Sequence, residues 1–200
     1  MKTKILSASL LVGLTAVVVG CSKLPAEAVP AVETALSTAE TAEAATYAPE
    51  ALNRARETLA QAQAEIAAQN DKFALTRKYG TAEALLEQAA AEARQAQDEA
   101  AAAKTQARAD AMAAADAGRA ALESAEALLA QAPSGKNTKA ELEAMQQELT
   151  ALRATLDQAA AAVAEESFLD AKVKADVVTS QATAIAADIR SAIEKVNAKR

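Results

Sequence analysis

Long stretches of this chain contain no residue that ends a helix. Beyond residue 30 the only prolines are Pro49 and Pro133, and the only glycines are Gly80, Gly118 and Gly135. Alanine, the strongest helix former, supplies 60 of the 200 residues, and Glu, Gln, Lys, Arg and Leu account for much of the remainder. Such a composition is typical of long helices and coiled coils, and β-branched residues nowhere alternate with polar ones over a useful length. The sequence therefore predicts an all-α fold.

Prolines and turn residues divide the first half of the chain into predicted helices. The first runs over residues 30–46, and Pro49, which is tolerated in a first turn, opens the second. This second helix, residues 49–69, carries residues spaced three and four apart along one stripe: Leu52, Ala55, Leu59, Ala62, Ile66, Gln69 and then Phe73. Asn70-Asp71 predicts a turn. Because the stripe stays in phase as far as Phe73, one continuous helix over residues 49–131 is the alternative.

The third predicted helix covers residues 72–132 and would be a rod of about 90 Å. Its larger apolar residues gather near its ends, and Met112 is the only one between residues 87 and 121. The middle is an alanine face, which lets a partner helix approach closely but contributes little hydrophobic free energy per residue. We expect Gly80 and Gly118 to mark close contacts between helices or a slight bend, and a functional hinge is the alternative.

The second half of the chain begins with the clearest loop, residues 133–137. Thr138 and Glu141 then resemble a capping box. The helix that follows has the best heptads in the chain: Leu142, Met145, Leu149, Leu152, Leu156, Ala159 and Val163. Residues 165–167 predict a turn, and the last helix again has 4-3 spacing: Ala171, Ala175, Val178, Ala182, Ile185, Ile189, Ala192 and Val196.

Apolar seams on consecutive helices joined by short turns indicate antiparallel neighbours. The predicted architecture is an elongated antiparallel helical bundle, or alanine-rich coiled coil, with one very long central helix. All four aromatic residues lie near predicted turns: Tyr47, Phe73, Tyr79 and Phe168. We expect them to fill the ends of the bundle, and a site at which a ligand stacks is the alternative.

The N-terminal segment has the layout of a secretory signal peptide. Lys2 and Lys4 form a basic start, an uncharged stretch covers residues 5–20, and Gly20 precedes the single cysteine, Cys21. The stretch of about 16 residues is shorter than the roughly 20 that span a bilayer. Its end resembles the bacterial lipobox, which implies cleavage between Gly20 and Cys21 and acylation of Cys21, for example with palmitate. An uncleaved membrane anchor and a plain secretory signal that leaves a free thiol are the alternatives.

The same resemblance to bacterial lipoproteins bears on the membrane that holds the chain. In those proteins the residue after the cysteine influences sorting, and aspartate there is associated with retention in the inner membrane. Here the residue is Ser22. The resemblance therefore favours the outer membrane of a Gram-negative cell, with the body facing the periplasm, over the inner membrane.

The residue types present argue against catalysis. There is no histidine, and Cys21 is assigned to the lipid, which removes the usual general base, zinc ligands and thiol nucleophile. Carboxylates need a shaped pocket that shifts their pKa, and two Phe, two Tyr and no Trp offer little to line one. The net charge of −6, without a basic stripe, argues against nucleic acid. We expect no enzyme, no cofactor and no metal.

Residues 30–105 resemble an uncharacterised family of alanine-rich helical domains. The resemblance lies in the run from Ala48-Pro49-Glu50-Ala51-Leu52 to Arg56, in Leu59-Ala60-Gln61-Ala62 and in residues 79–93. Those domains occur in Gram-negative envelope lipoproteins, often just before an OmpA-like peptidoglycan-binding domain. The resemblance implies a helical fold and no established activity. Residues 105–200 read as further helix in place of an OmpA-like domain, so the resemblance gives no support to peptidoglycan association.

A second comparison concerns the murein lipoprotein, which is joined to peptidoglycan through its C-terminal lysine. This chain ends Ala198-Lys199-Arg200, so Lys199 is penultimate. Basic residues at a helix C-terminus are expected from the helix dipole alone. We therefore expect no covalent attachment of Lys199 to peptidoglycan.

Together these patterns divide the chain into a signal peptide at 1–20, a tether at 21–29, a helical hairpin with the long helix at 30–131, a loop at 132–139 and a C-terminal hairpin at 140–200 that packs on the long helix. The expected function is that of a membrane-anchored structural or protein-interaction lipoprotein of the cell envelope: a spacer, tether or scaffold. Its expected partners are the membrane, through the lipid on Cys21, and an envelope protein. A periplasmic binding module or chaperone for apolar cargo, such as lipid or an outer-membrane protein, is the alternative.

Overall fold

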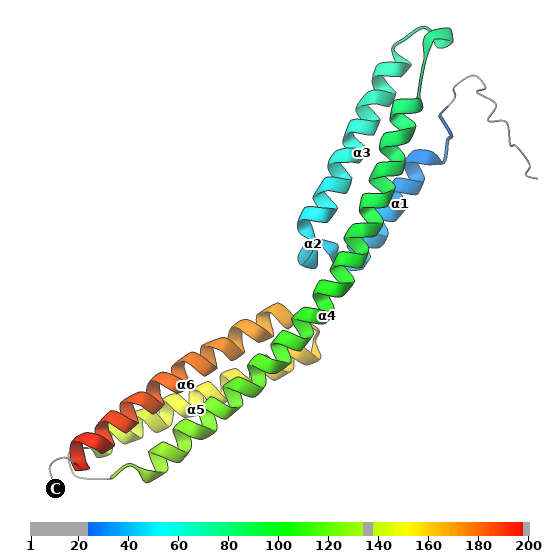
Figure 1. The fold of residues 1–200 in the computed structure, drawn as a ribbon. Helices are drawn as coiled ribbons and strands as arrows, with labels where there is room; N and C mark the ends of the chain where they lie inside the picture. Colours follow the sequence, from blue (N-terminus) through cyan, green and yellow to red (C-terminus); the bar gives the residue numbers. More distant parts are fainter. Residues whose placement is uncertain (1–23, 134–137, 198–200) are drawn as a thin grey trace, which may run out of the picture.

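The computed structural model describes residues 24–133 and 138–197, and this part of the chain is helical without strands (Figure 1). Its helices are α1 (Ala28–Thr41), α2 (Ala44–Tyr47), α3 (Pro49–Asn70), the short 3-10 helix η1 (Ala74–Thr76), α4 (Gly80–Gln131), α5 (Lys139–Ala164) and α6 (Phe168–Asn197). The all-α prediction is confirmed.

The longest helix, α4, is the axis of the molecule. Its 52 residues correspond to about 78 Å, and it contacts each of the other α-helices described. Its first half packs with α1, α2 and α3, and its second half packs with α5 and α6, so that two bundles lie end to end along it (Figure 1). The prediction of an elongated bundle around one very long helix is confirmed.

Consecutive long helices are antiparallel, as predicted, but α6 runs parallel to α4. Phe168, at the start of α6, packs against Ala107 and Ala111 in the middle of α4. Further along both helices, Ile189 of α6 shares a cluster with Leu122 of α4. The parallel orientation follows from the two turns between α4 and α6, since each turn reverses the chain.

The buried face of α4 is made largely of alanine. Its buried residues are spaced mostly three and four apart: Ala82, Leu86, Ala89, Ala93, Ala96, Ala100, Ala107, Ala111, Gly118, Leu122 and Ala125. Because alanine is small, neighbouring helix backbones approach closely along this face. The larger apolar side chains come chiefly from the partner helices and from the two ends of α4.

The first predicted helix, residues 30–46, is wrong at both ends. Helix α1 begins at Ala28, so Pro30 lies in its first turn, where a helix has no intrahelical acceptor for its amides. The predicted tether, residues 21–29, therefore includes the start of α1. After Thr41 the chain turns at Glu43, and the separate short helix α2 follows.

The prediction of a turn after residue 69 is confirmed, and the alternative of one helix over residues 49–131 is wrong. Residues 71–79, which we call the tip loop, separate α3 from α4 at one end of the molecule (Figure 1). Pro49 opens α3, as predicted. The hydrogen bonds that fix the loop run from the Lys78 amide to Gln69 Oε1 (3.0 Å), from Arg77 Nη2 to the Asn70 carbonyl (2.7 Å) and from the Tyr79 hydroxyl to Asn70 Oδ1.

Three of the four aromatic residues fill bundle ends. Tyr79 and Phe168 are buried, and Tyr47 is partly buried. Phe73 is the exception, because 73% of it is exposed. The helix that would have placed Phe73 on the apolar stripe ends at Asn70, so its side chain is not carried into the core.

The two glycines of α4 differ in their surroundings. A Cβ on Gly118 would lie 3.3 Å from both the Ala175 carbonyl oxygen and a methyl group of Leu156. The predicted close contact is therefore confirmed at Gly118. A Cβ on Gly80 would meet nothing within 4 Å, so Gly80 does not mark a close contact.

The predicted capping box at the start of α5 is also wrong. Thr138 makes no side-chain capping hydrogen bond to the helix. Its hydroxyl instead donates to the Pro133 carbonyl at 3.2 Å, which ties the helix start back to the first residue of the preceding loop. Ser134 to Asn137 of the predicted loop lie outside the described residues.

Candidate functional site at the junction of the two bundles

Two helix ends meet near the midpoint of α4, one from each bundle. Glu43 follows α1 with φ 62° and Glu166 follows α5 with φ 60°, and within the described ranges no other non-glycine residue has a positive φ. The Glu166 turn is a Schellman motif, in which the Glu166 amide donates to Val163 and the Ser167 amide donates to Ala162. Glycine is the residue usually found at such a position, because it has no Cβ. Glutamate therefore occupies two left-handed positions at which glycine is common.

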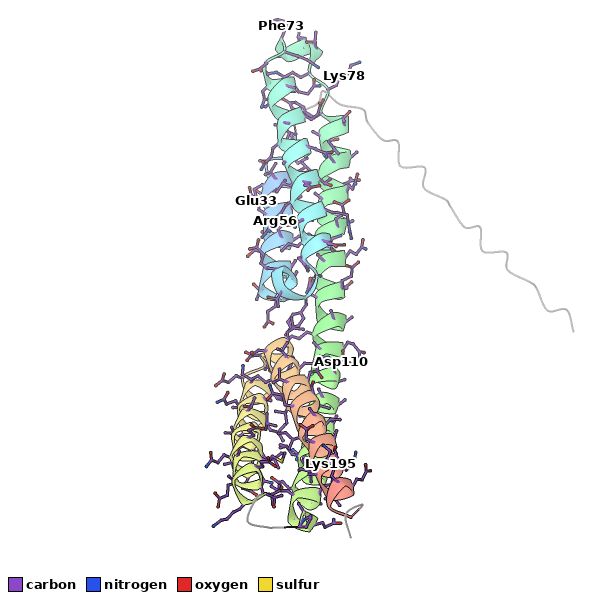
Figure 2. The ribbon with its side chains drawn as sticks, turned by 90° about the vertical axis from the view of Figure 1, so that its left-hand side faces the viewer. Glu33, Arg56, Phe73, Lys78, Asp110 and Lys195 are labelled. Carbon is purple, nitrogen blue, oxygen red and sulfur yellow. The ribbon has the colours of Figure 1, made fainter. Side chains whose placement is uncertain are left out.

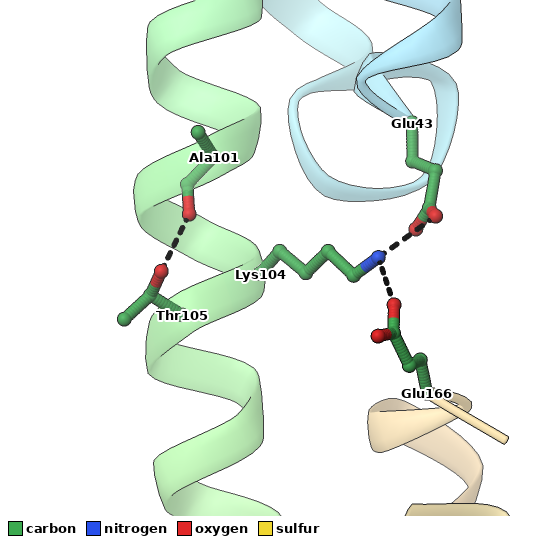
Figure 3. Close-up of polar contacts among 5 residues, drawn as sticks. All are labelled: Glu43, Ala101, Lys104, Thr105 and Glu166. Atoms are coloured by element: carbon green, nitrogen blue, oxygen red, sulfur yellow. Dashed lines mark hydrogen bonds and ion pairs between the residues drawn. The ribbon is translucent and has the colours of Figure 1, made fainter. Parts of the chain in front are cut away.

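Both side chains reach one lysine of α4 (Figure 3). Lys104 Nζ lies 2.9 Å from Glu43 Oε1 and 2.7 Å from Glu166 Oε2. We call these three residues the junction triad. A single ammonium group on the shared helix thus joins the end of one bundle to the end of the other.

The charges of the junction triad stabilise one another. Hydrogen bonds to Glu166 and then to Glu43 raise the pKa of Lys104 well above its usual value. The hydrogen bond from Lys104, followed by its charge, lowers the pKa of the Glu166 carboxyl, and Arg108 adds a smaller effect in the same direction. A lysine whose pKa is raised keeps its proton at neutral pH, so it is not an amine nucleophile. The triad is an ion-pair link, and its partial exposure means that salt weakens it.

An apolar cluster lies beside the junction triad. Phe168 packs with Ala107 and Ala111 of α4, and Tyr47 of the other bundle packs against this cluster. Tyr47 also packs against the core of the first bundle, so its ring contacts both bundles. The two aromatic rings supply the bulk that α4 lacks here, where its only large apolar residue, Met112, is exposed.

Two surface grooves lie away from the junction. One, of about 440 Å³, lies between α1 and α4 and is lined by residues that include Pro25, Val32 and Leu86. The other, of about 480 Å³, lies between α5 and α6 and includes Leu152 and Ile185. Alanines and acidic side chains complete the first lining, and the second also contains Thr155 and Gln181; neither groove contains an aromatic residue. Both are furrows between neighbouring helices.

The residues predicted for lipidation and cleavage, Cys21 and Gly20, lie outside the described residues, as does Lys199. Over residues 24–133 and 138–197, no helix combines the length and apolar character that crossing a bilayer requires. The same residues contain no cluster of three acidic side chains that could hold a metal ion. No protein-family model, curated protein or solved structure matches the chain.

The junction triad was not predicted from the sequence, although one signal points to its lysine. Lys104 is the only lysine of α4 and lies at the middle of that helix, within its most alanine-rich stretch. Glu43 carries no comparable signal, because glutamate is uncommon in left-handed turns.

Proposed function

We propose that this protein is a structural or protein-interaction lipoprotein of the bacterial cell envelope, held to the outer membrane by an acyl group on Cys21. The protein holds a partner at a distance from the membrane or presents a helical face to that partner, and it performs no catalysis. The observation that carries the proposal is the 52-residue α4, which runs without interruption through both bundles.

A spacer has to resist bending, and two features of the fold serve that need. The hydrogen-bonded backbone of α4 continues across the junction, so the bundles are joined by a helix rather than by a loop. The junction triad and the ring of Tyr47 add contacts between the bundles at the same level. The furrows along α1 and α4 and along α5 and α6 offer surfaces on which a helical partner can pack.

The anchor is tested by cell fractionation with a matched pair of variants. We expect Cys21→Ala to leave the outer-membrane fraction, whereas Lys23→Ala, two residues away, stays with it. Mass spectrometry of the mature N-terminus should find Cys21 acylated. A Cys21→Ala protein that still sediments with the outer membrane, or a mature wild-type protein with an unmodified thiol, would contradict the proposal.

The shape is tested separately by small-angle scattering on the chain from residue 21. A globular protein of 180 residues has a radius of gyration of about 16 Å. A rod as long as α4 alone has one of about 22 Å, because 52 residues extend about 78 Å. A value near the globular figure would refute the spacer. Lipid that co-purifies with this chain and leaves only on delipidation would instead favour a carrier of apolar cargo.

A further inference from the structure

The tip loop, residues 71–79, exposes large apolar side chains that the fold does not use. Phe73 is 73% exposed and Leu75 is 88% exposed, and they are the most exposed of the large hydrophobic residues described. Phe73 directly precedes η1 and Leu75 is the second residue of η1. Figure 2 shows Phe73 at the end of the molecule. Large apolar side chains exposed close together are a feature of protein and membrane interaction sites.

Basic residues surround these two side chains, although the chain as a whole is acidic. Residues 71–78 contain one acidic residue, Asp71, and three basic ones, Lys72, Arg77 and Lys78, which gives the segment a local net charge of +2. The whole chain has a net charge of −6. Lys72 and Lys78 are both exposed. Apolar side chains beside lysines are the combination that binds the interface of a membrane with anionic lipids.

The tip loop also lies near the place where the N-terminal segment joins the fold. Pro25 and Ala28 line a groove together with Glu83 and Leu86, which are in the first two turns of α4. Leu86 is seven residues beyond Tyr79, or about 10 Å along the helix. Cys21 and Pro25 are four residues apart in the chain, which can span about 14 Å. A membrane that holds an acyl group on Cys21 is therefore within reach of the tip loop.

We propose that the tip loop is a second membrane contact, which places Phe73 and Leu75 in the interface of a bilayer containing anionic lipids. The inference rests on the proposed anchoring through Cys21 and adds an orientation to it. With both contacts made, the molecule stands on its α3–α4 end. The α5–α6 bundle, which carries Lys195 at its far end, is held furthest from the membrane (Figure 2).

The absence of tryptophan from the chain allows a direct test. All buried residues of the three apolar clusters lie between Val32 and Ile189, so the chain from residue 21 keeps every one of them. This chain is prepared with Cys21→Ala, so that no acyl group contributes to binding, and with Phe73→Trp as the only indole. Val173→Trp, at an exposed position on α6, is the matched control.

Both proteins are titrated with vesicles of phosphatidylcholine alone and of phosphatidylcholine mixed with phosphatidylglycerol. We expect the fluorescence of Phe73→Trp to shift to the blue with the anionic vesicles and to be quenched by brominated acyl chains, while Val173→Trp does not respond. Adding Lys72→Gln and Lys78→Gln should weaken binding by roughly 25-fold, because each lysine near an anionic surface contributes about fivefold. Lys139→Gln with Lys195→Gln, at the other end, should leave it unchanged.

Equal responses from the two indoles, equal binding to both vesicle types, or no response from Phe73→Trp would each overturn the inference. So would a tip loop that ignores vesicles and crosslinks in cells, through a photoreactive group at position 73, to a protein alone. These outcomes are independent of the anchor. An unmodified Cys21 in the mature protein would refute the proposed function while the vesicle response persists, and an acylated Cys21 with an unresponsive tip loop would refute this inference alone.

Discussion

Substitutions at Gly118 give the most direct test of how closely α4 packs against its neighbours. Here α4 lies so close to α6 that a Cβ would be 3.3 Å from the Ala175 carbonyl oxygen and 3.5 Å from Thr179 Oγ1. The carbonyl belongs to the backbone of a packed helix, so relieving the contact requires a shift of α6. On the α5 side the nearest atom is a methyl group of Leu156, also at 3.3 Å, and a side chain can adjust more easily.

The expected free energies follow from two opposing effects. Glycine inside a helix costs about 1 kcal/mol relative to alanine. Ala113→Gly, at an exposed position of the same helix, measures that cost in this protein. For Gly118→Ala we expect the same gain to be cancelled by the tight contact, so that stability changes little or falls. For Gly118→Leu we expect a loss of about 1–3 kcal/mol from overpacking.

The measurement is urea unfolding of the chain from residue 21, followed by far-UV circular dichroism. Leu156→Ala is combined with Gly118→Ala in a double-mutant cycle, and it should restore part of the gain because it removes the more mobile of the close neighbours. A Gly118→Ala protein that is more stable than wild type by the full cost measured at Ala113 would refute the close approach of α4 and α6. A Gly118→Leu protein of undiminished stability would refute it as well.

Two further predictions concern the aromatic residues and the junction triad. Phe168→Ala should lower the free energy of unfolding by about 3–5 kcal/mol, whereas Phe73→Ala should change it by less than about 0.5 kcal/mol, and urea unfolding of the two variants measures both. Lys104→Met should be less stable than wild type near neutral pH and at low salt. Because the pKa of Glu166 is lowered and that of Lys104 is raised, the difference should be fully present between pH 4.5 and 10.5. It should shrink as the pH falls below or rises above this window, and a difference independent of pH from acid to alkaline conditions would contradict the ion-pair assignment.

Periodicity predicted the seams of the long helices well. The 4-3 pattern of α6 places buried residues from Ala171 to Ile189 on one face, as expected from the sequence. The stripe of α3 from Leu52 to Ala62 is likewise buried. These predictions succeed because the sequence position of a residue determines its direction around the helix axis. A regular spacing of apolar residues therefore identifies the face that packs.

The turns were harder to predict, because several of their residues are not types that usually mark a turn. Glu43 adopts a left-handed conformation with no glycine or asparagine to mark it, and the predicted first helix ran past it. Phe73 continues the spacing of the α3 stripe, yet the helix has already ended at Asn70. The position of this turn depends on side chains such as that of Gln69, whose Oε1 accepts a hydrogen bond from the amide of Lys78, nine residues later. Contacts of this kind join positions that no local pattern relates.

The distribution of apolar residues explains why the two bundles need a junction of their own. In the core of the first bundle ten of the fifteen buried residues are alanine, whereas six of the nine in the second are leucine, isoleucine or valine. Between Leu86 and Leu122, which are about ten turns apart, α4 has no buried residue larger than alanine. The side chains of α4 therefore bury the least apolar area near the junction of the two bundles, where the rod would bend. The rings of Tyr47 and Phe168, brought in by the neighbouring turns, restore apolar contact there. The ion pairs between Lys104 of α4 and the two glutamates hold those turns against the helix, and the alanine face of α4 stays free for close packing.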